Sequence, residues 1–291
     1  MKTLSARVGD VDLCFDDWGG SGRPVLFLHA TGFSRGCWRP MASELAERCR
    51  PILVDLRGHG GSTALDRPYV WAQLADDVGG LISGQGWKDV VLVGHSVGGA
   101  TAVEVAGRLG APVSALVLAE PVLMERPRTE TTLEAVTPTS PLVERTRQRR
   151  AVWPTQEEAK AYLRGRPPYS LWAEPVRESW LETAFLPKEG EWVLSCPPFV
   201  EASIFELTGG SRAMDYLPEL ACPTWLIRAT GSLGMRTTCA PSVAGSIRNC
   251  DEFVVPGSGH FLPLQYPEFV VSLVNMALDH LESGASDKPA S

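Results

Sequence analysis

The stretch Val91-Leu92-Val93-Gly94-His95-Ser96-Val97-Gly98-Gly99-Ala100 places a serine between an apolar run and a run of small residues. The apolar run at 90–93 predicts a buried strand, and the spacing over 97–109 predicts a helix. A serine on such a sharp strand-to-helix turn exposes its hydroxyl at the carboxyl edge of a sheet, beside the positive end of the helix. Glycines flank the serine because side chains there would collide with the strand and helix. We predict that Ser96 is a nucleophile; the alternative is a glycine-rich turn that merely holds a serine.

A second predicted strand ends in a loop of small residues. The apolar run Val25–Leu28 predicts a buried strand, and His29-Ala30-Thr31-Gly32-Phe33 follows it. One backbone N–H of this loop, together with that of Val97, would form an oxyanion hole for the negative charge that develops beside Ser96. We expect His29 to be structural and to bond the loop backbone rather than to take part in catalysis.

A third predicted strand is followed by a histidine. The stretch Val254-Val255-Pro256-Gly257-Ser258-Gly259-His260-Phe261 is an apolar run with a glycine-flanked loop after it. A histidine in that loop is placed to act as the general base for Ser96, and the alternative is a histidine that only bonds backbone. His59 on a turn, His95 facing inwards beside the nucleophile and His280 on the last helix fit the role less well.

Strands and helices alternate at both ends of the chain. Strand patterns occur at 4–8, 11–15, 25–28, 52–54, 90–93, 115–119, 224–227 and 253–255, and helical spacing occurs at 38–48, 69–82, 97–109 and 269–281. Short apolar strands separated by helices indicate an α/β fold with a mostly parallel, doubly wound sheet covered on both faces. We predict that residues 1–120 and 218–283 form this core and that the small, polar residues 284–291 form a flexible tail.

The segment 121–217 breaks this rhythm and is predicted to be an inserted helical cap over one end of the sheet. It is rich in proline, tryptophan and charge, with helical patches at 157–163 and 176–185 and no clear parallel strand. Its four tryptophans are candidate substrate-binding residues, and the alternative is that they form the cap's own core. They are Trp153, Trp172, Trp180 and Trp192.

Four motifs together resemble those of the α/β-hydrolase superfamily. They read LHATGF, DLRGHGGS, GHSVGG and GHFLPLQYPE, in that order, and the resemblance covers Val11–Glu120 and Cys222–Leu281. It implies an α/β-hydrolase fold in which Ser96 attacks the substrate and His260 is the base. It also implies an oxyanion hole made by the N–H of Val97 with that of Ala30 or Thr31.

The acid of the expected triad is missing from its usual place. Members of the superfamily usually carry it in the loop after the strand that corresponds to 224–227, but residues 223–250 contain no Asp or Glu. Glu120, at the end of strand 115–119, is the best replacement, because this place resembles the acid's position in zearalenone lactone hydrolases and some haloalkane dehalogenases. We expect its carboxylate within about 2.6–3.2 Å of His260 Nδ1. The alternatives are an acidic helix cap or a salt bridge to the cap.

These residues predict acyl transfer to water. Ser96 would attack a small-molecule ester or lactone, with His260 as base and backbone N–H groups holding the oxyanion, and neither a metal nor a cofactor is implied. A serine rather than an aspartate at position 96 argues against dehalogenase or epoxide-hydrolase chemistry. Carbon–carbon bond hydrolysis and perhydrolysis on the same triad stay open, as does a ligand-binding protein with little turnover.

Composition narrows the class of protein further. The chain has 291 residues, of which 44% are hydrophobic and 21% charged, and its net charge of -7 argues against a nucleic-acid partner. No stretch approaches the roughly 18 consecutive apolar residues that span a bilayer, so no membrane partner is expected. Seven cysteines without CxxC spacing suit free thiols in a reducing compartment. We therefore expect a cytoplasmic protein, and a homodimer is left open.

Overall fold

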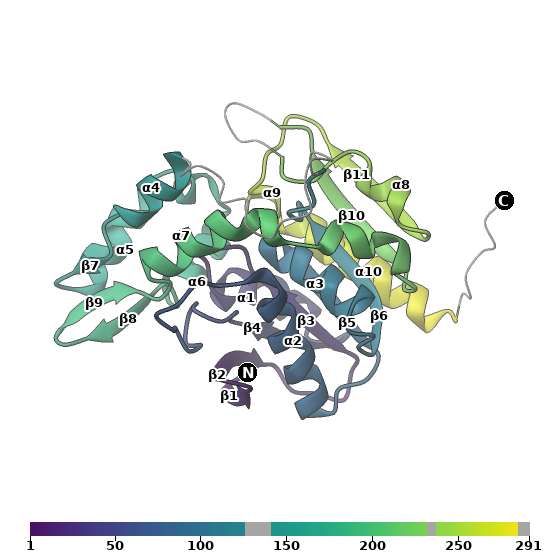
Figure 1. Cartoon of the computed structure of the whole chain (residues 1–291). Helices are drawn as coiled ribbons and strands as arrows, with labels where there is room; N and C mark the ends of the chain where they lie inside the picture. The colour runs from purple at the N-terminus through teal and green to yellow at the C-terminus, as the bar shows by residue number, and fades with distance from the viewer. Residues whose placement is uncertain (126–140, 232–236, 285–291) are drawn as a thin grey trace.

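A computed structural model describes residues 1–125, 141–231 and 237–284 of the chain. Part of the predicted cap and residues 285–291 of the predicted tail lie outside these ranges. An eight-stranded sheet has the order β1-β2-β4-β3-β5-β6-β10-β11 (Figure 1). Its strands are β1 Lys2–Val8, β2 Val11–Asp17, β3 Pro24–Leu28, β4 Arg50–Val54, β5 Val90–His95, β6 Val113–Ala119, β10 Thr224–Ala229 and β11 Cys250–Val255.

The sheet is parallel from β4 to β11, while β1 and β2 form an antiparallel hairpin at one edge. The central strands β3, β5 and β6 are almost entirely buried, as parallel strands covered on both faces must be. Because neighbouring parallel strands end at the same edge, Ser96, Glu120 and the loop after Leu28 come together there. The predicted α/β-hydrolase fold with a mostly parallel sheet is confirmed.

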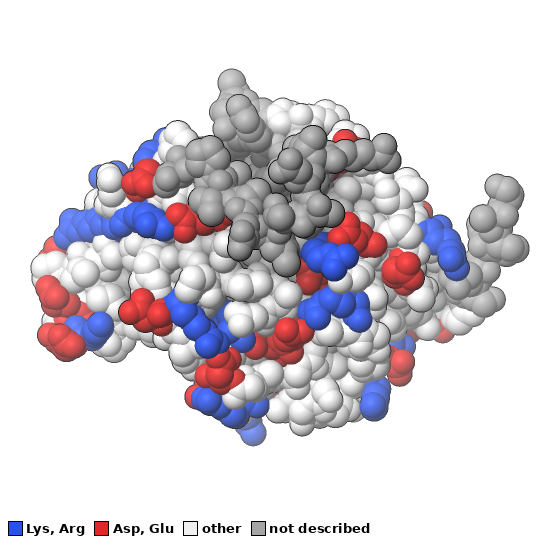
Figure 2. Space-filling view, viewed as in Figure 1, with Lys and Arg blue, Asp and Glu red and all other residues white. Residues whose placement is uncertain are grey.

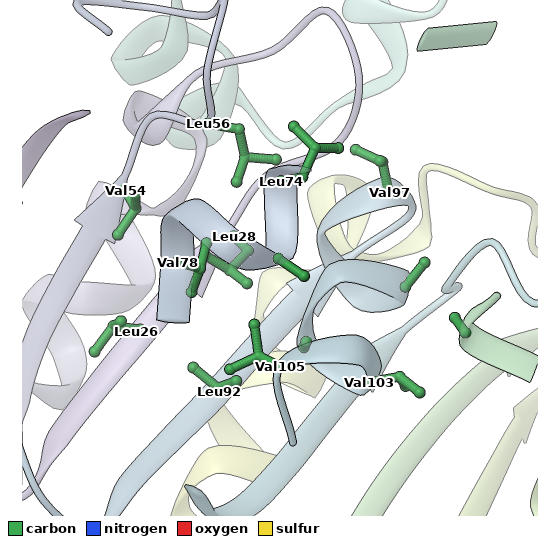
Figure 3. Close-up of a cluster of buried hydrophobic side chains, with 14 of the residues drawn as sticks. Leu26, Leu28, Val54, Leu56, Leu74, Val78, Leu92, Val97, Val103 and Val105 are labelled. Carbon is green, nitrogen blue, oxygen red and sulfur yellow. The ribbon is translucent and has the colours of Figure 1, made fainter. Parts of the chain in front are cut away.

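Helices cover both faces of this sheet. They are α1 Arg39–Leu45, α2 Trp71–Gln85, α3 Val97–Gly107, α8 Val243–Ser246, α9 Leu262–Gln265 and α10 Pro267–Glu282. Leu26 and Leu28 of β3 join a buried cluster with residues of α2 and α3, which Figure 3 shows in close-up. Val25 and Phe27 point the other way and join a cluster with α1 and α10. The period of two along the strand therefore divides the apolar residues between two cores.

The cap contains a small sheet besides its helices. The described elements are α4 Pro141–Arg147, β7 Val152–Trp153, α5 Gln156–Arg164, α6 Glu174–Leu181, β8 Phe185–Lys188, β9 Glu191–Leu194 and α7 Pro198–Glu206. β7, β9 and β8 form an antiparallel sheet, which the sequence analysis did not predict. The 3-10 helices η1 Arg35–Trp38, η2 Tyr169–Leu171, η3 Leu207–Gly210 and η4 Ala213–Glu219 complete the described elements.

The described part of the predicted cap shares its buried apolar residues with the two cores of the main sheet. Trp172 and Trp180 belong to the cluster of α1 and α10, whereas Val200 and Ile204 of α7 belong to that of α2 and α3. The cap is therefore packed against the core, and its aromatic residues reach the end of the sheet where the strand-end loops lie.

Three global expectations can be compared with the structure. No helix among the described residues is long and apolar enough to cross a membrane. All seven cysteines are free, and burial raises the pKa of the Cys14 thiol to about 11. The last strand begins earlier than predicted, so Asp251 and Glu252 lie within β11, where Glu252 pairs with Arg228.

Candidate active site

Ser96 occupies a strained turn between β5 and α3. Its backbone has φ 57° and ψ −121°, which a residue other than glycine rarely adopts. The neighbouring glycines permit the turn, because a Cβ on Gly98 would lie 2.3 Å from the carbonyl oxygen of Leu28 and one on Gly94 would lie 2.5 Å from that of Gly98. The turn puts the serine at the carboxyl edge of the sheet, as the sequence predicts for a nucleophile.

His260 lies within hydrogen-bond distance of this serine. Its Nε2 is 3.0 Å from Ser96 Oγ, and it follows β11 by a short loop. Nε2 of His95 donates to the carbonyl oxygen of His260 at 2.8 Å and so fixes the loop that carries the base. Burial lowers the pKa of His95 well below its usual value, so this histidine stays neutral and acts as a structural donor.

Glu120 is buried beside this pair, at the end of β6. Its backbone takes a positive φ of 47° and donates to the carbonyl oxygen of Ile227 at 2.9 Å. Its carboxylate accepts hydrogen bonds from the N–H of Ala229, the hydroxyl of Thr237 and the N–H of Thr238. The donors come from the end of β10 and the chain after it, so among the described residues the carboxylate makes neither a helix cap nor a salt bridge to the cap.

The carboxylate is close to the base but does not make the direct hydrogen bond that the sequence analysis expects. Glu120 Oε2 lies 3.6 Å from His260 Nδ1, outside the expected range. Its position is set by the three donors, which hold it toward β10.

The group nearest to that ring nitrogen is the hydroxyl of Thr238. Its Oγ1 is 3.0 Å from His260 Nδ1 and 3.3 Å from the carbonyl oxygens of Glu120 and Pro121. Since carbonyl oxygens can only accept, the hydroxyl donates to one of them and accepts the Nδ1 proton of His260. Nε2 is then free to take the proton of Ser96, as a general base must. The sequence analysis missed Thr238, which lies in a loop without any recognisable pattern.

Two buried histidines hold the loop that follows β3. Nε2 of His59 accepts the N–H of Gly32 at 3.0 Å, while Nε2 of His29 accepts the N–H of Leu56 at 3.1 Å. Their Nδ1 atoms lie 2.8–3.0 Å from the carbonyl oxygens of Ala30 and Arg57 and donate to them. Burial lowers the pKa of His29 to about 4 and that of His59 to about 3, so both rings are neutral at ordinary pH.

This arrangement bears on the predicted oxyanion hole. The N–H of Gly32 is engaged by His59, whereas those of Ala30 and Thr31 donate to no other described residue. Val97 is the first residue of α3, at the end of a helix where N–H groups lack intrahelical partners. The candidate donors therefore stay the N–H of Val97 with that of Ala30 or Thr31.

Aromatic side chains of the cap meet the site through Phe33. The ring of Phe33 stacks on His95 and contacts Trp172 edge-on at a centroid distance of 4.8 Å. Trp180 contacts Phe33 at 5.9 Å, and Phe261 contacts both His260 and Trp172. Two of the four candidate tryptophans therefore pack near the site: Trp172 against Phe261, which contacts His260, and Trp180 against Phe33, which contacts His95.

The other two tryptophans lie elsewhere in the cap. Trp153 packs against Tyr162 and Phe185, and Trp192 is opposite it in the small sheet. Neither has a ring contact to the residues around Ser96 in the described part of the chain. No group of three or more potential metal ligands gathers anywhere in residues 1–125, 141–231 and 237–284.

Comparison with known proteins shows the family to which this fold belongs. Residues 25–273 match a family model described as the alpha/beta hydrolase family. A 2-(acetamidomethylene)succinate hydrolase of Mesorhizobium japonicum is 26% identical over 263 residues, or 89% of each chain. A non-heme chloroperoxidase of Kitasatospora aureofaciens is 36% identical over 111 residues, which are 38% of this chain and only 40% of that relative.

Solved structures show the same fold over nearly the whole chain. A crystal structure of an E-2-(acetamidomethylene)succinate hydrolase has a TM-score of 0.75 at 24% identity, covering 96% of this chain and 100% of its own. A malate-bound thermophilic esterase from Thermogutta terrifontis has a TM-score of 0.68 at 26% identity, covering 97% of this chain and 99% of its own.

Proposed function

The chain belongs to the alpha/beta hydrolase family, and from this premise we propose that it is a serine hydrolase that cleaves a carboxylic ester or lactone through an acyl-enzyme intermediate. The observation that carries the proposal is the 3.0 Å distance between Ser96 Oγ and His260 Nε2, at a strained turn on the carboxyl edge of the sheet. Ser96 itself is buried, with 5% of its surface exposed, whereas the sequence predicts a hydroxyl open to solvent. A hydroxyl and an imidazole in this relation form the pair that activates serine for nucleophilic attack.

In the proposed reaction, Ser96 Oγ attacks the substrate carbonyl carbon while His260 Nε2 takes its proton. The N–H of Val97 and that of Ala30 or Thr31 hold the resulting oxyanion. His260 then returns the proton to the leaving alkoxide, and the acyl group stays on the serine. A water, deprotonated by His260, attacks the acyl carbon, and the acid product leaves as Ser96 recovers its proton.

The proposal gives Glu120 and Thr238 the task of orienting His260. The Thr238 hydroxyl accepts the Nδ1 proton, and the buried carboxylate 3.6 Å away stabilises the positive imidazolium that forms during attack. A carboxylate fixed by three donors stays in place without reorganising as the charge develops.

The residues around the site support a substrate with an apolar part. Phe33, Trp172 and Phe261 are in ring contact with one another beside His95 and His260. The names of the relatives support an acyl bond as the target, since they include an esterase and a hydrolase of an acetamido compound. We propose esters and lactones whose acyl or alcohol part is apolar or aromatic.

Perhydrolysis is the second candidate, favoured by the similarity to a non-heme chloroperoxidase over 38% of the chain. Hydrogen peroxide would then replace water in the attack on the acyl-enzyme and release a peracid. The same serine and histidine would serve both reactions.

A panel of aryl esters, alkyl esters and macrolactones, followed by rapid-mixing kinetics, tests the proposal. We expect hydrolysis of at least one class, with a burst of alcohol release equal to the enzyme concentration when deacylation is slower than acylation. Hydrolysis no faster than that of Ser96→Ala across the panel would contradict the proposal and favour a ligand-binding protein. Peracid formation on addition of hydrogen peroxide would identify the second activity.

A further inference from the structure

A cavity lies in the predicted cap, and Ser96 is not among the residues that line it. It has a volume of about 260 Å³ and lies between the end of α4, helix α5 and the segment that leads into η2. Its walls carry four arginines and two tyrosines: Arg145, Arg149, Arg150, Arg166, Tyr162 and Tyr169. No Asp or Glu is among its lining residues.

Only one of these four arginines is neutralised by a carboxylate within the described residues. Arg149, on the inner side, donates to Glu201 at 2.6 Å and to the hydroxyl of Tyr169 at 2.9 Å. Arg145 and Arg150 donate to the backbone carbonyls of Pro141 and Val152. Those bonds fix the side chains, and neither guanidinium pairs with a carboxylate in the described part of the chain.

The ring of Tyr162 lies against the guanidinium groups of Arg150 and Arg166. The guanidinium carbon of Arg166 lies 4.0 Å from the ring centroid of Tyr162, and that of Arg150 lies 5.3 Å from it. Such stacking restricts the long side chains and leaves their N–H groups available for a ligand. Figure 2 shows Lys and Arg side chains gathered over α4 and α5, although the whole chain has a net charge of -7.

We propose that this cap cavity is a binding site for a multiply charged oxyanion, namely a phosphate or a dicarboxylate. Guanidinium groups bind such groups through paired N–H donors, and three positive charges that pair with no carboxylate of the described residues favour a ligand with at least two negative ones. The floor, which includes the buried Thr146, Leu163 and Tyr169, limits the screening of these charges by water. The site does not depend on Ser96 being the nucleophile.

Tyr169 links this cavity to the region of the candidate active site. Its hydroxyl bonds Arg149, while its ring stacks on Trp180 at a centroid distance of 4.7 Å and contacts Phe33. The bound anion has two candidate sources. It is either the charged end of the substrate, far from the reacting bond, or a separate anion that alters turnover through the contact of Tyr169 with Trp180 and Phe33.

Calorimetric titration of the intact protein with inorganic phosphate and with succinate tests the binding site. We expect saturable binding of one anion per chain that weakens at high salt. Arg150→Gln and Arg166→Gln should each weaken it at least tenfold. Arg164→Gln is the matched control, because Arg164 lies two residues before Arg166, at the end of α5, but pairs with Glu178 and does not line the cavity. Absence of saturable binding of both anions, or equal binding by all variants, would overturn the proposal.

Ester hydrolysis then distinguishes the two sources of the anion. If the anion belongs to the substrate, Arg150→Gln raises KM for an ester that ends in a carboxylate and leaves that for the matching neutral ester unchanged. If the anion is separate, added phosphate or succinate changes the rate with the neutral ester in the wild type but not in Arg150→Gln. The titration is independent of both results, so a protein without esterase activity would still reveal the site.

Discussion

Glu120 Oε2 lies 3.6 Å from Nδ1 of His260, and the hydroxyl of Thr238 makes the closer contact at 3.0 Å. The direct carboxylate–histidine hydrogen bond expected from the sequence is therefore absent from this arrangement. In the proposed reaction, a buried carboxylate at this distance would stabilise the imidazolium that forms as Ser96 attacks, because the interaction is weakly screened there. We therefore propose that an uncharged hydroxyl orients the base and that a nearby carboxylate stabilises it during the reaction.

Glu120→Gln should remove the charge that stabilises the imidazolium. We expect kcat for ester hydrolysis to fall by about three to four orders of magnitude, by analogy with loss of a triad acid. The glutamine side chain has only one acceptor oxygen for the three donors that the carboxylate accepts. At least one buried donor then loses its partner, so the free energy of unfolding should also fall by roughly 1–3 kcal/mol. Kinetics with urea unfolding measures both, with Glu125→Gln as an exposed control. Turnover within tenfold of wild type would show that the carboxylate is structural only.

Thr238→Val should keep the shape of the side chain and remove its hydroxyl. We expect kcat to fall by about 10- to 100-fold with little change in KM, since a hydrogen bond to a charged group contributes about 1.5–3 kcal/mol. Thr238→Ser retains the hydroxyl and should recover most of the loss. A valine variant with unchanged kcat would show that His260 finds another acceptor, and one in which KM alone rises would place Thr238 in substrate binding.

Features of the fold that depend on local sequence patterns were predictable from the sequence. The positions of Ser96 and Glu120 follow from strands of apolar residues that end at one edge of a parallel sheet, and the glycines around Ser96 follow from contacts that permit no Cβ. The small cap sheet was not predictable, since β7 to β9 are two to four residues long and carry too little alternation.

Details that depend on tertiary packing were also beyond the sequence. Thr238 reaches His260 only because its loop folds back over Glu120, and no residue spacing indicates that approach. The 3.6 Å separation of Glu120 and His260 results from donors on Ala229, Thr237 and Thr238, which are distant from Glu120 in sequence.

His59 should make stability depend on pH. Burial lowers its pKa to about 3 in the folded protein, so the unfolded chain, with a pKa of about 6.5, binds more protons between these values. The stabilising contribution of neutral His59 to folding is therefore fully present above about pH 6.5. As the pH falls below that value, the free energy of unfolding decreases by at most about 1.4 kcal/mol per pH unit. Urea unfolding from pH 4.5 to 7.5 should show the stability advantage of wild type over His59→Gln shrinking with acidity. Parallel curves would mean that His59 takes up its proton at the same pH in the folded protein as in the unfolded chain.

Replacing Trp172 by leucine should change the substrate preference, whereas replacing Trp153 should not. Both are buried, so Trp172→Leu and Trp153→Leu should each lower thermal stability. Trp172 contacts Phe33 and Phe261, which lie beside His95 and His260, and its loss should change relative rates among esters of increasing acyl size about tenfold. Trp153→Leu should leave that order unchanged. An unchanged order in both variants would make these tryptophans packing residues alone.

Stoichiometric labelling with a fluorophosphonate probe tests the central claim most directly, because the probe reacts only with an activated serine. Peptide mass spectrometry of the labelled protein should locate one probe per chain on Ser96, and esterase activity should disappear in proportion to labelling. Ser96→Ala should fold, take up no probe and lose at least about three orders of magnitude in kcat. An unlabelled Ser96 in the folded wild-type protein, or a Ser96→Ala variant that keeps its turnover within a few fold, would contradict the assignment of Ser96 as the nucleophile.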